Sequence, residues 1–77
     1  MRYEYDDGFR FEADTPEEIC AAIHNSMKFR WTDSLEEWMR DHAERCSKWD
    51  GKIYSAENFE EHVIDLLRHG VIRRIGD

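Results

Sequence analysis

The sequence predicts an α+β domain in which an N-terminal β-hairpin, three helices and a short C-terminal strand surround one small core. Three observations predict this class. Aromatic residues alternate around an Asp-Gly turn, three segments show helical periodicity after polar caps, and an aliphatic run follows a late glycine. Because the chain has only 77 residues, we expect a single domain spanning residues 1–77.

The first element is a hairpin expected between Tyr3 and Ala13. Aromatic and polar residues alternate on both sides of the turn 6–8, Asp-Asp-Gly. Asp-Gly is a strong hairpin signal because these residues tolerate positive φ angles. One face of the hairpin is expected to carry four aromatic side chains: Tyr3, Tyr5, Phe9 and Phe11.

Two capping boxes predict where the first two helices begin. Thr15 caps the first helix, Pro16 suits its first position and Glu18 closes the box. Ser34 and Glu37 form the same pattern for the second helix. The first helix is expected to bury Ile19, Ile23 and Met27, and residues 28–33 to form a loop. The second is expected to bury Leu35, Trp38, Met39, His42, Cys46 and Trp49 and to end at Asp50-Gly51.

The third helix is expected to start at a Ser55 cap and to end at Gly70. Its buried face would carry Phe59, Val63, Leu66 and Leu67, while His62 and His69 flank that face at the surface. Residues 71–75 then read as a short strand, which can pair with the hairpin and complete a three-stranded sheet.

Composition excludes several classes of protein. The formal net charge of −7 argues against a nucleic-acid binder, which needs cations to displace counterions from phosphates. The 40 % hydrophobic fraction is too high for a disordered acidic tail. No apolar run reaches membrane-spanning length, and the N-terminus lacks the apolar segment of a signal peptide. Two cysteines in such a chain predict free thiols in a reducing cytoplasm.

The negative charge is concentrated in two segments. Residues 1–27 carry a net charge of −5, and residues 53–67 carry −4 without a single base. Glu57, Glu61 and Asp65 are spaced four residues apart, so a helix there would present one carboxylate about every 6 Å on one face. Such a row suits a cationic groove on another protein. It is also what the positive end of a helix dipole and solubility alone would favour.

Four residues suggest a metal site as an alternative. Cys20 and His24, and likewise His42 and Cys46, are four residues apart on expected helices, so two facing helices could offer a Cys2His2 set to zinc. This spacing matches no standard zinc finger, and buried cysteines beside boundary histidines would give the same pattern. No nucleotide-binding, protease or hydrolase motif occurs, so we expect no catalytic residue, no metal and no cofactor.

The order and character of the segments carry a resemblance to a known class. The aromatic hairpin is followed by the capped start Thr15–Ile19, the charged helix Leu35–Arg45, the acidic helix Phe59–Leu67 and then Gly70-Val71-Ile72. In the order of its segments, in size and in charge, the chain resembles small acidic accessory proteins of phages and mobile elements, among them anti-CRISPR proteins.

The resemblance implies a non-enzymatic viral inhibitor that acts in the host cytoplasm. It would dock on a CRISPR effector subunit through an acidic face and block the effector's cationic nucleic-acid-binding surface. The partner-binding residues would be Glu57, Glu61 and Asp65, with Asp6, Asp7, Asp14, Glu17 and Glu18 as a second acidic group. Two other hypotheses stay open: a homodimeric structural or regulatory interaction module, and a zinc-stabilised small domain.

Overall fold

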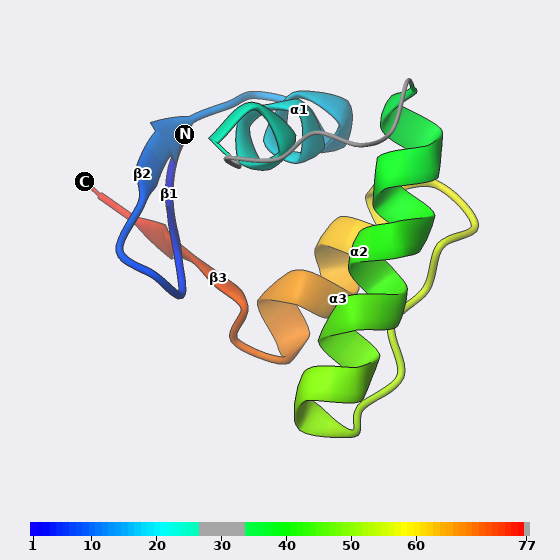
Figure 1. The fold of residues 1–77 in the computed structure, drawn as a ribbon. Coiled ribbons are helices and arrows are strands. Elements are labelled where there is room, and N and C mark those ends of the chain that lie inside the picture. The colour runs from blue at the N-terminus through cyan, green and yellow to red at the C-terminus, as the bar shows by residue number, and fades with distance from the viewer. Residues whose placement is uncertain (27–33, 77) are drawn as a thin grey trace.

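The computed structural model confirms the α+β class and describes residues 1–26 and 34–76. Figure 1 shows the sheet on one side of the domain, α1 running across the top, and α2 and α3 on the other side. Met27 and the expected loop at 28–33 lie outside the described residues. The elements, in chain order, are β1 (Arg2–Tyr5), β2 (Arg10–Glu12), α1 (Pro16–Ser26), α2 (Leu35–Asp50), α3 (Phe59–Arg68) and β3 (Ile72–Ile75).

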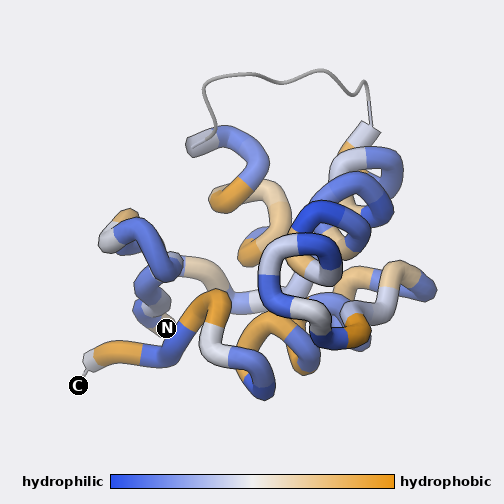
Figure 2. The backbone as a smooth tube through the Cα atoms, turned by 60° about the horizontal axis from the view of Figure 1, so that its bottom comes forward, coloured by the Kyte–Doolittle hydropathy of each residue, from blue (hydrophilic) through white to orange (hydrophobic). Residues whose placement is uncertain are grey.

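The three strands form an antiparallel sheet in the order β2-β1-β3. The C-terminal strand therefore pairs with the hairpin, as the sequence predicts, and its partner there is the first strand. Gly8 closes the hairpin turn at a φ of 94°, a value that its missing Cβ makes accessible. Figure 2 shows β3 as hydrophobic at both ends of a short hydrophilic stretch, which matches its sequence Ile-Arg-Arg-Ile.

The two faces of the sheet differ in chemistry. Tyr3 pairs with Phe11 in register, both are buried, and their ring centroids lie 5.7 Å apart. On the opposite face, Glu4 on the central strand forms ion pairs with Arg10 on one neighbour and Arg73 on the other. Alternation along the strands thus separates an apolar face from an ion-paired one. Of the expected aromatic face, Tyr5 is half-buried and Phe9 is exposed.

The helix starts at α1 and α2 follow the predicted caps. The Glu18 backbone N–H donates to Thr15 Oγ1 over 3.1 Å, and Glu18 returns the bond by accepting from the Thr15 N–H over 3.1 Å. Ser34 Oγ accepts from the Glu37 N–H over 3.1 Å. Gly51 then ends α2 in the left-handed region with a φ of 73°, where glycine is favoured.

The predicted start of the third helix is wrong by three residues. Asn58, not Ser55, is the N-cap, because its side chain accepts from the Glu61 N–H over 2.8 Å. The backbone of Ser55 bonds elsewhere, so residues 51–58 form a non-helical connection, which we call the link. The C-terminal end is as predicted: Gly70 has a φ of 79°, and the Val71 N–H donates to the Leu66 carbonyl.

The core lies between the sheet and the three helices. Ile19, Ile23, Trp38, Met39 and Leu66 are buried in it, as the periodicity predicts. The prediction that Trp49 is buried is wrong, because this residue is 89 % exposed on the last turn of α2. Among the described residues, no helix has both the length and the apolar character that crossing a membrane requires.

The position of the α3 cap can be tested by comparing two alanine variants. We expect Asn58→Ala to lower the free energy of unfolding by about 1 kcal/mol, because the helix loses its N-cap. Ser55→Ala serves as the matched control and should cost clearly less, because its hydroxyl accepts only one long bond, 3.3 Å from the Glu57 N–H. Urea denaturation followed by circular dichroism measures both values. A larger loss for Ser55→Ala would contradict this assignment.

Candidate functional site

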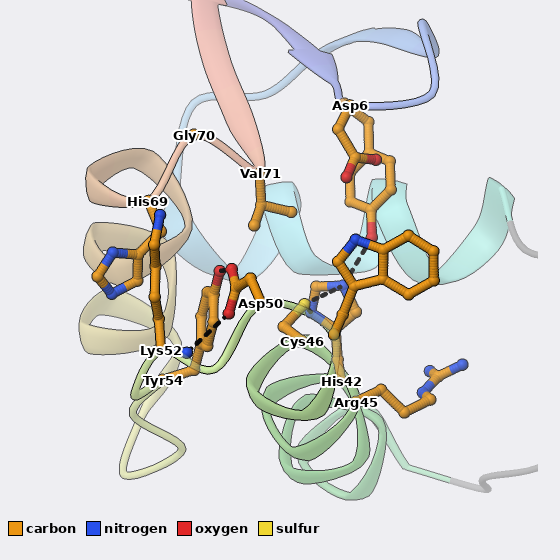
Figure 3. Close-up of a pocket in the computed structure, with 12 residues that line it drawn as sticks. Asp6, His42, Arg45, Cys46, Asp50, Lys52, Tyr54, His69, Gly70 and Val71 are labelled. Carbon is orange, nitrogen blue, oxygen red and sulfur yellow. Dashed lines mark hydrogen bonds between the residues drawn. The ribbon is translucent and has the colours of Figure 1, made fainter.

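A pocket of about 480 Å³ opens where four parts of the chain meet. Its lining comes from the end of β1 and the hairpin turn, the second half of α2, the link, and the turn between α3 and β3. Figure 3 shows Asp6 above the pocket, Cys46 and Asp50 along α2, and His69, Lys52 and Tyr54 on the opposite side. The volume falls in the range of roughly 300–1,000 Å³ that is typical of ligand sites.

A chain of buried hydrogen bonds starts at the pocket wall and runs into the core. Tyr5 Oη lies 2.9 Å from His42 Nε2, and His42 Nδ1 lies 2.9 Å from His62 Nε2. His62 Nδ1 in turn lies 2.9 Å from the carbonyl oxygen of Ser55. We call these four residues the histidine chain. It joins β1, α2, α3 and the link through polar contacts.

The donor and the acceptor of each bond in the histidine chain follow from the Ser55 carbonyl, where this chain of bonds ends. A carbonyl oxygen can only accept, so His62 Nδ1 carries the proton and donates to Ser55. With His62 neutral, its Nε2 accepts from His42 Nδ1–H, and His42 Nε2 then accepts from the Tyr5 hydroxyl. Every ring nitrogen of both histidines is therefore satisfied while both rings are uncharged, as a buried polar network requires.

Burial favours the uncharged form of every titratable group in the histidine chain. Burial, with the neighbouring His62 and Arg45, lowers the pKa of His42 to about 3. Burial also lowers the pKa of His62 and raises that of Tyr5. The indole of Trp38 stacks on the His42 ring with centroids 4.6 Å apart, which shields the imidazole further.

Cys46 lies beside the histidine chain but is not poised as a nucleophile. Its sulfur is 3.7 Å from His42 Nε2, the nitrogen that accepts from Tyr5. Burial, with the negative charges of Asp50 and Asp6, raises the pKa of the thiol to about 11. A reactive cysteine needs a lowered pKa, so this environment opposes nucleophilic catalysis at neutral pH.

The link is fixed to the rest of the pocket by side chains from α2, from α3 and from the turn after α3. Asp50 accepts from the Tyr54 hydroxyl and, over 2.9 Å, from the Lys52 N–H. Asp65 accepts from the Ser55 N–H over 2.8 Å, and His69 Nε2 donates to the Ile53 carbonyl over 3.1 Å. The link therefore has a defined path, although its Ile53 side chain is 85 % exposed.

The predicted partner-binding carboxylates do not gather on one face. Asp6 lines the pocket at the hairpin turn, and the adjacent Asp7 accepts from the Phe9 N–H. The hairpin turn lies against Gly70 and Val71, just beyond the C-terminal end of α3. Glu57 and Glu61 are at the other end of that helix, about 15 Å away for ten residues. The third group, Asp14, Glu17 and Glu18, surrounds the start of α1.

Several of these carboxylates already have partners within the chain. Asp14 pairs with the terminal ammonium of Met1 over 3.4 Å, and Glu18 completes the α1 capping box. Asp65 is only 14 % exposed and holds both the Ser55 N–H and Arg68. Since α3 begins at Phe59, Glu57 precedes the helix. The expected row of three carboxylates on one helix face is therefore wrong.

The two cysteine–histidine pairs also stay apart. Cys20 is fully buried, with a pKa raised to about 12 by burial and by Glu17, while the His24 ring packs against Trp38. Both cysteines are free thiols. Among the residues that the structure describes, no group of three or more His, Cys, Asp or Glu side chains could hold a metal ion.

Sequence reasoning missed the histidine chain because it placed His62 at the surface, whereas His62 is fully buried. Its position was a usable signal: His62 follows Phe59 by three residues and precedes Leu66 by four, which puts it on the apolar face of α3. Leu67, expected there instead, is exposed.

A scan of protein-family models and searches of curated proteins and of solved structures found no match to this chain. The function is therefore argued from the geometry of the site and from the charges around it.

Because of the histidine chain, we expect the free energy of unfolding to depend on pH. Unfolded imidazoles take up protons as the pH falls below about 6.5, whereas folded His42 resists until about pH 3. The unfolded state then binds more protons, so the free energy of unfolding should decrease between pH 7.5 and 5, before most carboxylates titrate. Urea denaturation at each pH measures it. In His42→Gln this slope should be shallower. A pH-independent free energy in the wild type would contradict the prediction.

Proposed function

We propose that this domain is a non-enzymatic inhibitor that binds another protein through the carboxylates at the beginning of α3. The partner presents a basic surface, and the inhibitor covers that surface. The proposal concerns protein binding, because the acidic domain and a nucleic acid repel each other.

The observation that carries the proposal concerns the exposure and the ion pairing of Glu57, Glu60 and Glu61. All three are exposed, and none forms an ion pair with another residue in ranges 1–26 and 34–76. Some other acids of the described chain are matched internally, as Glu4 is with Arg10 and Arg73, and Asp65 with Arg68. The start of α3 is thus a concentrated negative charge that an external cation can neutralise.

A purely structural account of these glutamates competes with the proposal. Acids in the first turn of a helix are stabilised by the helix dipole by about 0.3–1 kcal/mol each. That account explains Glu60 and Glu61, which lie in the first turn of α3, but not Glu57, which precedes the Asn58 cap. Long-range attraction would also speed the encounter with a basic partner and make it sensitive to salt.

The resemblance to anti-CRISPR proteins supplies the class of partner. CRISPR effectors hold their nucleic acids in positively charged channels, which are the kind of surface that an acidic domain can cover. We therefore propose a CRISPR effector subunit as the partner and obstruction of its nucleic-acid-binding surface as the mode of inhibition.

Charge reversal tests the proposal. Glu57→Lys combined with Glu61→Lys should reduce inhibition of a sensitive effector at least about tenfold, because the double variant repels basic surfaces. The measurement is target-DNA binding and cleavage by a panel of purified effectors at increasing inhibitor concentration. Asp65 is left unchanged because it holds the link.

The matched control is Glu36→Lys combined with Glu37→Lys, which moves the same charge at the start of α2, where both residues are exposed. The control should inhibit like the wild type. Equal inhibition by the Glu57/Glu61 variant and the wild type would reject the acidic surface. No inhibition of any effector by the wild type would reject the proposed partner class.

A second candidate function, a homodimeric interaction module, is favoured by the outer edge of β2. The bonds from Tyr5 N–H to the Phe9 carbonyl and from Ala13 N–H to the Met1 carbonyl show that the backbone groups of Arg10 and Glu12 face away from β1. Two copies pairing antiparallel about Phe11 would set each Arg10 opposite Glu12 of the second copy.

The homodimer has a direct test in light scattering at micromolar concentration. If β2 pairs with itself, the wild type should show twice the chain mass, and Glu12→Lys should return it to the monomer mass by opposing like charges. A monomer mass for the wild type contradicts this candidate. The inhibitor proposal is compatible with either mass.

A further inference from the structure

Trp49 presents a large aromatic surface at the rim of the pocket. Its side chain is 89 % exposed, while the indole of Trp38 on the same helix is buried. Trp49 lines the pocket together with Asp6 of the hairpin turn and Cys46 of the same helix. Exposed tryptophans of this kind are over-represented among the residues that dominate binding energy in protein interfaces.

Asp6 faces the same pocket from the hairpin turn, and its carboxylate is uncompensated. It makes no hydrogen bond or ion pair with another described residue, whereas Asp50 across the pocket is occupied by Tyr54 and by the Lys52 N–H. Partial burial and the adjacent charge of Asp7 raise the pKa of Asp6. The positive charge of a cation in the pocket would stabilise the ionised carboxylate and so oppose this rise in pKa.

The electrostatics of the pocket agree with a cationic guest. The negative charges of Asp50 and Asp6 both act on the Cys46 thiol and on the Tyr54 hydroxyl, although the two aspartates come from α2 and from the hairpin turn. Two cations also line the pocket. In Figure 3 the Arg45 guanidinium points away from Asp6 and Asp50, and the Lys52 side chain lies on the side of His69.

We propose that the pocket receives an arginine side chain of the partner protein, with its guanidinium stacked on the Trp49 indole and paired with the Asp6 carboxylate. The inference rests on the proposed function, since the partner is the same basic protein. Arginine fits better than lysine because its planar guanidinium stacks on an aromatic ring and offers parallel N–H donors to one carboxylate.

The stacking would immobilise Trp49, which is exposed in the free chain. Trp49 and Ile53 flank the turn at Gly51 and are both almost fully exposed, so a bound segment that reaches this turn would also cover apolar surface. An arginine in the pocket and apolar contact on the rim would then act together with Glu57, Glu60 and Glu61, which reach basic residues further along the partner.

The test is a titration of the isotope-labelled full chain with short blocked peptides, followed by NMR. The probes are acetyl-Gly-Arg-Gly-amide, its lysine counterpart and its citrulline counterpart, which keeps the shape of arginine without the charge. We expect the arginine peptide to shift the Trp49 indole N–H and the amide signals of Asp6. The lysine peptide should bind more weakly, and the citrulline peptide should leave these signals unchanged.

Variants then assign the two contacts. Trp49→Ala and Asp6→Asn should each weaken arginine-peptide binding by about tenfold, and Trp49→Phe should retain most of it because the aromatic face remains. Glu36→Gln is the matched control, since it removes one exposed carboxylate outside the pocket, and it should bind like the wild type. Trp49→Ala should also keep the wild-type unfolding temperature, because the side chain is exposed.

Three results would overturn the inference: equal shifts with the citrulline peptide, binding by Trp49→Ala that equals the wild type, or shifts that map outside the pocket. The peptide titration needs no effector, so it fails or succeeds separately from the inhibition assay. Inhibition without arginine-peptide binding rejects the pocket alone, whereas peptide binding without inhibition rejects the proposed function alone.

Discussion

The fold depends on the hydrogen bonds that run from Tyr5 through His42 and His62 to the Ser55 carbonyl. These four residues belong to the sheet, α2, α3 and the link, so one chain of polar contacts fixes how the elements meet. Their bonds have one consistent direction, which holds only while both imidazoles are neutral. In a domain this small, expected to be stable by roughly 4–11 kcal/mol, leaving even one of these groups unpaired would remove a large share of the total.

The histidine chain also explains why the pocket has a defined shape. Ser55 is held on one side by His62 and on the other by Asp65, so the link cannot drift away from α3. The same arrangement keeps Asp65 from acting as a surface charge. A carboxylate that the charge pattern marks for binding thus has a structural task, while Asp6, at the hairpin turn, is left facing the pocket without a partner in the described chain.

The two proposals describe one binding mode at two ends of α3. In this mode, the glutamates at the beginning of the helix would attract the partner over a distance, which salt screens, and the pocket beyond its C-terminal end would make a directional contact. Interfaces commonly combine a polar rim with a few aromatic anchors. Among the side chains that the structure describes, Trp49 is suited to serve as such an anchor, since it is large, aromatic and almost fully exposed.

Local interactions explain what the sequence determined by itself. The Asp-Gly turn, the caps at Thr15 and Ser34 and the glycine after α3 act over a few residues, and the structure confirms each of them. The tertiary structure alone decided the rest. The bond of His62 to His42, exposure of Trp49 and the task of Asp65 depend on which elements pack together and how far each reaches, because a helical period marks a face but not what covers it.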